Sequence, residues 1–254
     1  MTMTYERRIM LAGATNFRDL GGYETTDGKT VRWRRVFRAD ALQDLTPEDI
    51  AILLELKLGH VFDLRTDMEI EVFGTNPLSE HGVLHHHVPF HPQVGRERDQ
   101  AATIPSFDDH AAFAALYLDM LENAGPSLAR IFTHLAEESE ASAVFHCAGG
   151  RDRTGMTAAL LLGLLGVPRE IIEEDYALTG QYLMFVEARL EKMRQLYGDR
   201  VGVRGTGPVE TPGEVIRLAL AGLDERYGSP ERYLEEAGVT AEHREALRGS
   251  LLDG

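Results

Sequence analysis

The sequence contains very little cysteine. Cys147 is the only cysteine among 254 residues, so no disulfide can form within the chain. This excludes a scaffold held together by internal disulfides, and a lone thiol fits a reducing compartment. A single cysteine also invites a chemical explanation, which its neighbours in the sequence can support or weaken.

Basic residues are also in short supply. The chain has 26 Lys and Arg against 41 Asp and Glu, which gives a formal net charge of -15. Its average surface therefore repels nucleic acid and anionic membranes. We expect no nucleic-acid partner, and any site for an anion must be built locally.

Long hydrophobic runs are absent. The longest apolar stretch, residues 156–167, is too short to cross a bilayer and fits a buried helix. The first ten residues hold no apolar segment of signal-peptide length. We expect a cytoplasmic protein without stable membrane insertion. The sequence leaves open both export by a non-classical route and the oligomeric state.

The composition is that of an ordinary globular protein, with 43% hydrophobic and 26% charged residues. No internal repeat or low-complexity tract interrupts it. A glycine-rich segment, residues 198–213, precedes a C-terminal stretch of about 40 residues, which is close to the lower limit for an independent core. We therefore expect one domain over residues 1–254.

Helical and extended patterns alternate along the chain. Thr46 and Pro47 are typical of a helix start, and short apolar runs bounded by glycine or charge predict strands. The expected extended segments are a hairpin within residues 16–40 and strands at 60–64, 83–89 and 143–146. The expected helices are 46–59, 66–73, 108–122, 126–138, 154–165, one starting at 168, then 182–196, 211–227, 230–237 and 241–252. This pattern indicates an α/β protein whose C-terminal third is largely helical.

The most informative segment is HCAGGRDRTG, residues 146–155, which lies between a predicted strand and a strongly apolar helix. Hydrolysis of a phosphate monoester needs an ionised nucleophile, donors for the phosphoryl oxygens and an acid for the leaving group. The thiol of Cys147 can become the nucleophile, because a glycine-rich turn at a helix N-terminus stabilises negative charge.

The same loop can bind the phosphate. Gly149 and Gly150 allow the backbone to curl so that successive N–H groups converge on one anion. Arg153, six residues after Cys147, can fold back and grip two phosphoryl oxygens with its planar fork. The predicted phosphate-binding residues are Ala148, Gly149, Gly150, Arg151, Asp152 and Arg153.

Three further side chains complete the predicted machinery. Asp152 is the nearest carboxyl that could protonate the leaving group and then activate water. The hydroxyl of Thr154 is placed to hydrogen-bond the cysteine sulfur and help it leave in the second step. His146 is expected to brace the loop backbone rather than transfer protons.

The loop resembles the HCxxGKDRTG loop of the bacterial atypical tyrosine and lipid phosphatases, the PtpB-like group of the protein-tyrosine phosphatase superfamily. Other segments are similar to recurring segments of that group, in the same order. They are NFRDLGG at 16–22, FRAD at 37–40, DLRT at 63–66 followed by Glu69, and DYALT at 175–179. The resemblance covers nearly the whole chain.

The resemblance implies a single phosphatase domain with a central, mostly parallel sheet flanked by helices, some of which can act as a lid. It places the catalytic loop at the C-terminal end of a strand. It also implies the roles given above to Cys147, Asp152, Arg153 and Thr154, a phosphocysteine intermediate, and no metal or other cofactor. The expected substrates are phosphotyrosine proteins, with phosphoserine, phosphothreonine or phosphoinositides as further candidates.

The chain departs from the group at one position of the loop. Arg151 stands where the group usually has Lys, a residue associated there with activity on phosphoinositides. The charge is kept but the geometry changes, so the choice between protein and lipid substrates stays open. The acid is also open, since other tyrosine phosphatases take it from a separate loop, and Asp63 is the second candidate.

Two clusters allow a second interpretation. Histidines at 85–87, with His91 beyond, suggest a metal site, but consecutive strand residues point to opposite faces and no cysteine is available, so we favour no metal. The arginines at 32, 34, 35 and 38 could attract a phosphate, but a solvated strand face paired with acids is favoured. Arg18 and Asp19 could bind phosphate or brace the loop as a pair.

Two other functions compete with a phosphatase. Sulfur transfer of the rhodanese type also uses a loop cysteine, but the sequence Asp152-Arg153-Thr154 argues against it. A non-catalytic phosphate-binding pseudophosphatase would be expected to have lost the nucleophile or the arginine. Cys147 and Arg153 are both present.

Overall fold

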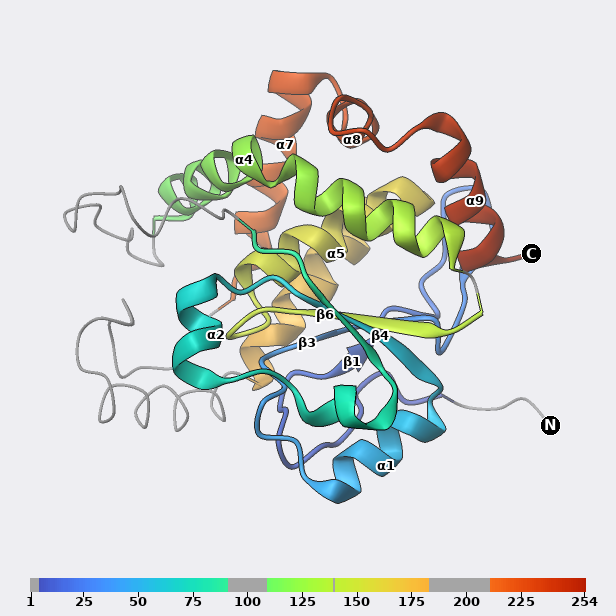
Figure 1. Cartoon of the computed structure of the whole chain (residues 1–254). Helices are drawn as coiled ribbons and strands as arrows, with labels where there is room; N and C mark the ends of the chain where they lie inside the picture. Colours follow the sequence, from blue (N-terminus) through green and yellow to red (C-terminus); the bar gives the residue numbers. More distant parts are fainter. Residues whose placement is uncertain (1–4, 91–108, 139, 183–210) are drawn as a thin grey trace.

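The structure is a computed structural model that describes residues 5–90, 109–138, 140–182 and 211–254 (Figure 1). The predicted helix at 182–196 beyond its first residue, the glycine-rich segment up to residue 210, and His91 lie outside these residues. Within the described ranges, no helix is long and apolar enough to cross a membrane.

A five-stranded sheet forms the centre of the molecule, in the order β1-β3-β6-β4-β5. Strand β1 runs antiparallel to β3, and the other neighbours are parallel. The predicted α/β fold with a mostly parallel sheet is therefore confirmed. The strands are β1 (Arg18–Asp19), β3 (Val36–Ala39), β4 (Leu58–Asp63), β5 (Leu84–His87) and β6 (Ser142–His146).

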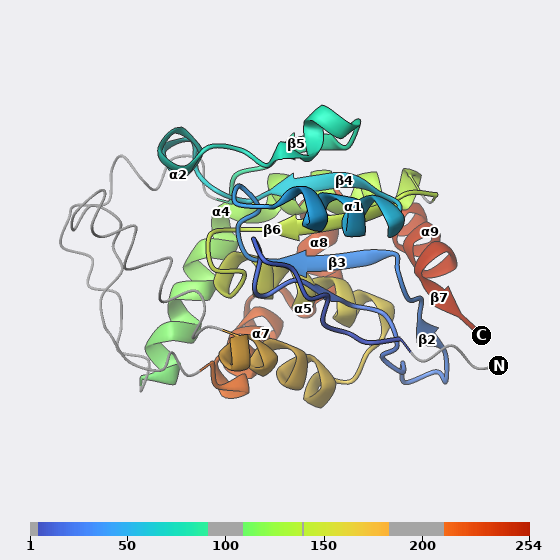
Figure 2. The same ribbon diagram turned by 90° about the horizontal axis from the view of Figure 1, so that it is seen from below.

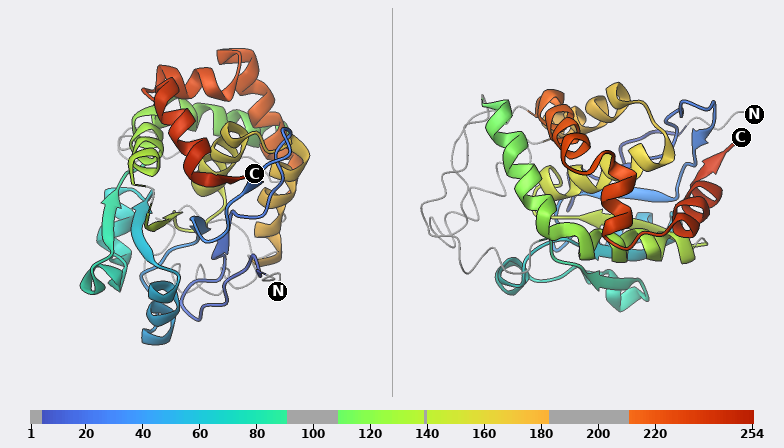
Figure 3. Two further views of the ribbon diagram at one scale, coloured as in Figure 1. Left: turned by 90° about the vertical axis from the view of Figure 1, so that its right-hand side faces the viewer. Right: turned by 90° about the horizontal axis from the view of Figure 1, so that it is seen from above.

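Helices cover both faces of this sheet (Figures 1 and 2). One face is covered by α4 (His110–Glu137), α5 (Asp152–Leu165), α7 (Gly213–Tyr227), α8 (Pro230–Glu236) and α9 (Ala241–Leu251), and the view from above in Figure 3 shows them over the strands. The other face packs against α1 (Pro47–Glu55). Side chains alternate accordingly: Phe62 and Phe145 join the larger core, whereas Val61 and Val144 join the smaller one beside α1.

Helix α1 begins as predicted and ends earlier. Thr46 and Asp49 form a reciprocal capping box, with Pro47 at the start of the helix. The prediction that this helix continues to residue 59 is wrong. Lys57 adopts a left-handed conformation with φ of 57°, and β4 starts at Leu58, so the chain leaves the helix after Glu55.

The prediction of two separate helices at 108–122 and 126–138 is also wrong. A single helix, α4, runs through Pro126. A proline inside a helix costs about 3 kcal/mol, but α4 buries an apolar face against α5, α7, α8 and α9, and this packing outweighs the cost.

The N-terminal hairpin forms in part. Strands β1 and β3 pair antiparallel, and Gly28, with φ of 81°, lies in the turn between Thr25 and Lys29. Between these strands, however, β2 (Thr30–Val31) pairs with β7 (Leu252–Asp253) at the far end of the chain. The remaining elements are α2 (Asp67–Phe73), η1 (Pro77–His81) and a helix at residues 169–182.

Candidate active site

The segment HCAGGRDRTG connects the C-terminal end of β6 to the N-terminus of α5 (Figure 1). The strand ends at His146 and the helix begins at Asp152, two residues before the predicted start. Within the part of the chain that the structure describes, no side chain caps the start of α5. The first amides of this helix, with their partial positive charge, are therefore available to an anion beside Cys147.

The carbonyl groups of the loop are turned away from its centre. The side-chain amide of Asn16 donates to the oxygens of Gly149 and Gly150 at 3.3 and 3.2 Å. Arg38 donates to the oxygen of Gly150 at 3.0 Å. Because the N–H and C=O of a peptide unit point in opposite directions, amides on the other side of these units face the centre of the loop.

Gly150 is required by this packing. Its φ of +68° lies in the left-handed region, and a Cβ at this position would lie 2.6 Å from the carbonyl oxygen of Ala39, at the end of β3. Gly149 is less constrained, since a Cβ there would meet no atom of the described residues within 4 Å. The second glycine therefore allows the loop to approach the sheet closely.

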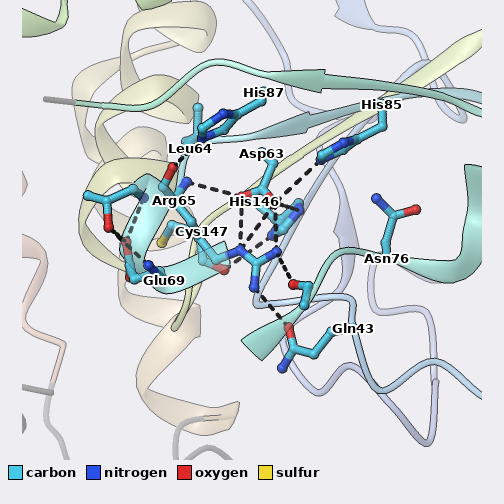
Figure 4. Close-up of polar contacts among 12 residues, drawn as sticks. Gln43, Asp63, Leu64, Arg65, Glu69, Asn76, His85, His87, His146 and Cys147 are labelled. Atoms are coloured by element: carbon cyan, nitrogen blue, oxygen red, sulfur yellow. Dashed lines mark hydrogen bonds and ion pairs between the residues drawn. The ribbon is translucent and has the colours of Figure 1, made fainter. Parts of the chain in front are cut away.

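Cys147 is buried at the base of the loop, and His146 before it is fully buried (Figure 4). The Nδ1 of His146 donates to the carbonyl oxygen of Cys147 at 3.2 Å, as a brace on the loop backbone would. Burial lowers the pKa of His146 to about 4, which keeps the ring neutral near pH 7.

Asp63 lies behind this histidine at the end of β4 (Figure 4). Its carboxylate binds Arg65 at 2.7 to 3.2 Å and lies 3.6 Å from the Nε2 of His146 and 3.4 Å from that of His85. Burial alone would raise its pKa, but His146, His85 and Arg65 outweigh burial and hold the pKa of Asp63 well below its usual range. A carboxylate held ionised in this way has no proton to give.

Arg153 is held by a glutamate on α2. Its Nη1 and Nη2 donate to the two carboxylate oxygens of Glu69 at 2.7 and 2.8 Å, and Nη1 also donates to the carbonyl of Leu64 at 3.3 Å. Glu69 is itself fixed, because it forms a capping box with Thr66 at the start of α2. Among the described residues, these bonds leave the N–H of Nε and one N–H of Nη2 without a partner, and the two form the side edge of the guanidinium.

Asp152 forms an ion pair within the loop. Arg151 donates to its two oxygens at 2.9 and 3.3 Å, and the hydroxyl of Tyr117 on α4 donates to the first of them. Tyr117 in turn contacts the hydroxyl of Tyr176 at 2.6 Å. Burial would raise the pKa of Asp152, but Arg151 and Tyr117 together lower it below its ordinary value.

The predicted hydrogen bond between Thr154 and the cysteine sulfur is not present. The side chain is fully buried, and its hydroxyl has no hydrogen-bond partner among the described residues. Thr154 lies in the first turn of α5, where the backbone continues the helix.

A buried ion-pair network supports the loop from below. Asp175 accepts from Arg18 at 3.2 Å, from Arg38 at 2.5 Å and from the hydroxyl of Tyr23 at 3.0 Å. Because these donors outweigh its burial, the pKa of Asp175 falls to about 2. Arg38 then reaches the carbonyl of Gly150. The network thus connects β1, β3 and the helix at 169–182 to the catalytic loop.

Arg18 therefore belongs to the network that supports the loop, but its ion-pair partner is not the predicted one. It binds Asp175 rather than Asp19, which accepts from the backbone amides of Gly21 and Arg34. The arginine cluster follows the predicted solvated face at three of its four positions. These three are partly exposed, and their contacts are Arg32 with Asp253, Arg34 with Asp19, and Arg35 with the carbonyl of Glu140. Arg38 differs, because it is fully buried in the ion-pair network around Asp175.

The histidine run alternates as expected for a strand. His85 contacts Asp63, and His87 donates to the carbonyl of Arg65 at 2.9 Å (Figure 4). His86 points to the other face of the sheet and contacts His60. Two of the three histidines therefore belong to the surroundings of the catalytic loop.

Sequence reasoning missed several residues around the loop. The sequence places Glu69 and Asp175 in segments that recur in the family but predicts no contact for them. It predicts no function for Asn16, Tyr117 or Tyr176. Most of these residues lie in the recurring segments at 16–22, 37–40, 63–69 and 175–179. Each of these segments contacts the loop or the ion-pair network beneath it. Tyr117 lies in no such segment, and only the fold brings it to Asp152.

Known proteins resemble this chain along most of its length. A family model described as "Tyrosine phosphatase family" matches residues 9–253. The chain is 26% identical to the triple specificity protein phosphatase PtpB of Mycobacterium tuberculosis, over 95% of this chain and 98% of that protein. It is 30% identical to a tyrosine-protein phosphatase of Nostoc commune over 62% of this chain, an alignment that spans about half (55%) of that relative.

Among solved structures, TpbA of P. aeruginosa is 17% identical, with a TM-score of 0.32 over 76% of this chain and 89% of that one. This likeness is weak, whereas the family model covers almost the entire sequence. On that match, the chain belongs to the tyrosine phosphatase family and is a phosphatase.

Proposed function

We propose that the protein hydrolyses phosphate monoesters through a phosphocysteine intermediate on Cys147, with phosphotyrosine as its preferred substrate. The proposal rests above all on the side edge of Arg153. Glu69 and Leu64 hold the end of the guanidinium, and the two remaining N–H donors can bind two phosphoryl oxygens. The curled amides of residues 148–153 can bind the phosphoryl oxygens beside it.

In the first step the thiolate of Cys147 attacks phosphorus, an S–P bond forms, and the bond from phosphorus to the ester oxygen breaks. Asp152 gives its proton to the departing oxygen. In the second step Asp152 accepts a proton from water, the water oxygen attacks phosphorus, and the S–P bond breaks to release orthophosphate. Arg153 binds the phosphoryl group most strongly where negative charge builds up.

Asp152 is the better acid of the two candidates. Asp63 is paired with Arg65 in the interior, and this pair holds it ionised. Asp152 lies on the loop itself, and its charge is balanced by Arg151. A bound phosphate dianion competes for Arg151, and weakening of that pair raises the pKa of Asp152 toward the range where it can carry a proton.

Arg151 is the residue on which substrate choice depends. It is engaged with Asp152 and stands near the ring of Phe113. A phosphoprotein needs only one phosphate site, whereas an inositol phosphate offers a second phosphate that a cation at this position could bind. Phosphotyrosine is therefore proposed first, with phosphoserine, phosphothreonine and phosphoinositides as further substrates that a parallel panel would rank.

We also propose that residues 1–254 act as one phosphatase domain. The larger core extends from Leu20 to Leu252 and includes Cys147, so the C-terminal helices share the core on which the loop is built. Location in the cytoplasm and a lid formed by C-terminal helices stay predictions.

The test is hydrolysis of a generic aryl phosphate with reductant and EDTA, by the wild type, Cys147→Ser and Asp152→Asn. We expect turnover by the wild type and none by Cys147→Ser. Asp152→Asn should lose activity on phosphotyrosine. On esters with very good leaving groups it should keep the first step, seen as a burst of released alcohol before a slow steady state. An inactive wild type, or a fully active Cys147→Ser, would rule out the mechanism.

A further inference from the structure

A cluster of three histidines lies away from the catalytic loop, at the interface between the sheet and α4. His60 comes from β4, His86 from β5 and His134 from α4. The Nδ1 of His60 lies 3.0 Å from the Nε2 of His134 and 3.2 Å from the Nε2 of His86. One nitrogen from each ring lies within 4.8 Å of the other two.

We propose that His60, His86 and His134 bind a divalent transition metal ion, with Zn²⁺ as the best fit. Zinc bonds imidazole nitrogen at about 2.0–2.1 Å, so two nitrogens on one tetrahedral zinc are about 3.3 Å apart. The Nδ1 of His60 lies 3.0 and 3.2 Å from the other two nitrogens, which is close to that value. A small rotation of His86 or His134 brings the nitrogens of these two residues to the same separation. Imidazole also suits the softness of this ion.

The surroundings leave room for a fourth ligand. His86 and His134 line a pocket of about 480 Å³ together with Phe62, Arg130 and Glu137, whereas His60 lies buried behind them. A water molecule in this pocket could complete a tetrahedral site, as in zinc sites with three protein ligands. The acidic chain, with a net charge of -15, also favours a bound cation.

The site would tie together elements that position the active site. His60 lies three residues before Asp63 on the same strand, and His86 lies between His85 and His87, which contact Asp63 and Arg65. A metal ion on the opposite face would join β4 and β5 to α4. It would stabilise this framework and take no part in hydrolysis, so it is independent of the proposed phosphatase mechanism.

The alternative is a dry cluster in which the Nε2–H of either His134 or His86 donates one hydrogen bond to the single lone pair on the Nδ1 of neutral His60, which either separation would allow. A titration of EDTA-stripped protein with Zn²⁺, using a chelating dye as competitor, separates the two. We expect one tight equivalent of Zn²⁺ in the wild type. His86→Gln and His134→Gln should each bind at least about tenfold more weakly, since even a change beyond the ligands has that effect.

Two matched variants control for other zinc ligands. His81→Gln changes an exposed histidine in η1, and Cys147→Ser removes the reactive thiolate. Both should keep the tight equivalent and the rise in Tm on adding Zn²⁺. The proposal is overturned if the wild type binds no Zn²⁺, if the His86 and His134 variants bind as tightly as the wild type, or if Cys147→Ser abolishes binding.

A second measurement covers the case in which the histidine variants fail to fold. Co²⁺ added to the wild type should give the visible absorption of a tetrahedral nitrogen-bound ion, without a sulfur-to-metal charge-transfer band. A charge-transfer band, or the spectrum of free aqueous Co²⁺, would contradict a site made of these three histidines.

Discussion

Glu69 binds both terminal nitrogens of the Arg153 guanidinium, with its two carboxylate oxygens at 2.7 and 2.8 Å. These residues come from α2 and α5, which are 84 positions apart in the sequence. The ion pair fixes the plane of the guanidinium before any substrate arrives. In the proposed mechanism a phosphate would then meet an arginine that is already oriented, so less entropy would be lost on binding.

The first prediction follows from this pair. Glu69→Gln keeps an oxygen for the capping box with Thr66 but removes the charge that holds Arg153. We expect kcat/KM on an aryl phosphate to fall by about 100-fold, the cost of a misplaced positioning group. Glu71→Gln, at an exposed position of the same helix, is the matched control and should change kcat/KM by less than about twofold. Equal activities of the two variants would contradict the assigned role.

The second prediction concerns the pH profile. Arg151→Gln removes a main cause of the lowered pKa of Asp152. Activity that needs protonated Asp152 is lost as the pH rises through its pKa, so a higher pKa moves the alkaline limb of kcat/KM to higher pH. Arg151→Lys keeps the charge and should shift the limb less. No shift in Arg151→Gln would argue against Asp152 as the acid.

The third prediction concerns stability. Asp175→Asn leaves Arg18 and Arg38 buried without a counter-charge, which should cost about 3–5 kcal/mol in urea unfolding at pH 7. Asp224→Asn breaks a partly exposed pair with Arg169 and should cost less than about 1 kcal/mol.

The sign of the pH effect provides a further check on the Asp175 network. The folded pKa of Asp175 is about 2, below the ordinary aspartate value of 3.8, so its ionisation stabilises the fold above pH 4. This contribution is lost as the pH falls toward 2. The difference between the wild type and Asp175→Asn should therefore narrow over that range, and a constant difference would contradict the assigned ion pairs.

The fourth prediction separates the two loop glycines. Gly150→Ala forces an L residue into the left-handed region and drives its Cβ toward the carbonyl oxygen of Ala39. The conformation alone costs about 1–2 kcal/mol, and the clash adds to it. Gly149→Ala meets no neighbour and should unfold at nearly the wild-type urea concentration. Similar midpoints for both variants would refute the close approach at Gly150.

The strand, loop and helix around residues 146–155 could be predicted from the sequence because their signal is local. Ten consecutive residues contain the proposed nucleophile, the glycines and the arginine, and the apolar runs on either side fix strand and helix. The capping residues Thr46 and Thr66 are equally local, and helices begin after both.

Contacts between distant segments could not be predicted in the same way. Arg38 and Asp175 are 137 positions apart, and only the packing of a helix on the sheet reveals that both are buried. The break predicted near Pro126 is wrong for a similar reason. The helix α4 stays continuous because its apolar face packs against helices that lie far along the chain. The three histidines of the proposed metal site come from three separate elements.

The phosphocysteine is the central claim, and the most direct test is to trap it. Asp152→Asn lacks the base for the second step, so with an ester that has a very good leaving group it should accumulate the intermediate. Mass spectrometry of the acid-quenched enzyme should then find one phosphoryl group on Cys147, and none in Cys147→Ser treated identically. A phosphoryl group on another residue, or undiminished turnover by Cys147→Ser, would contradict the account.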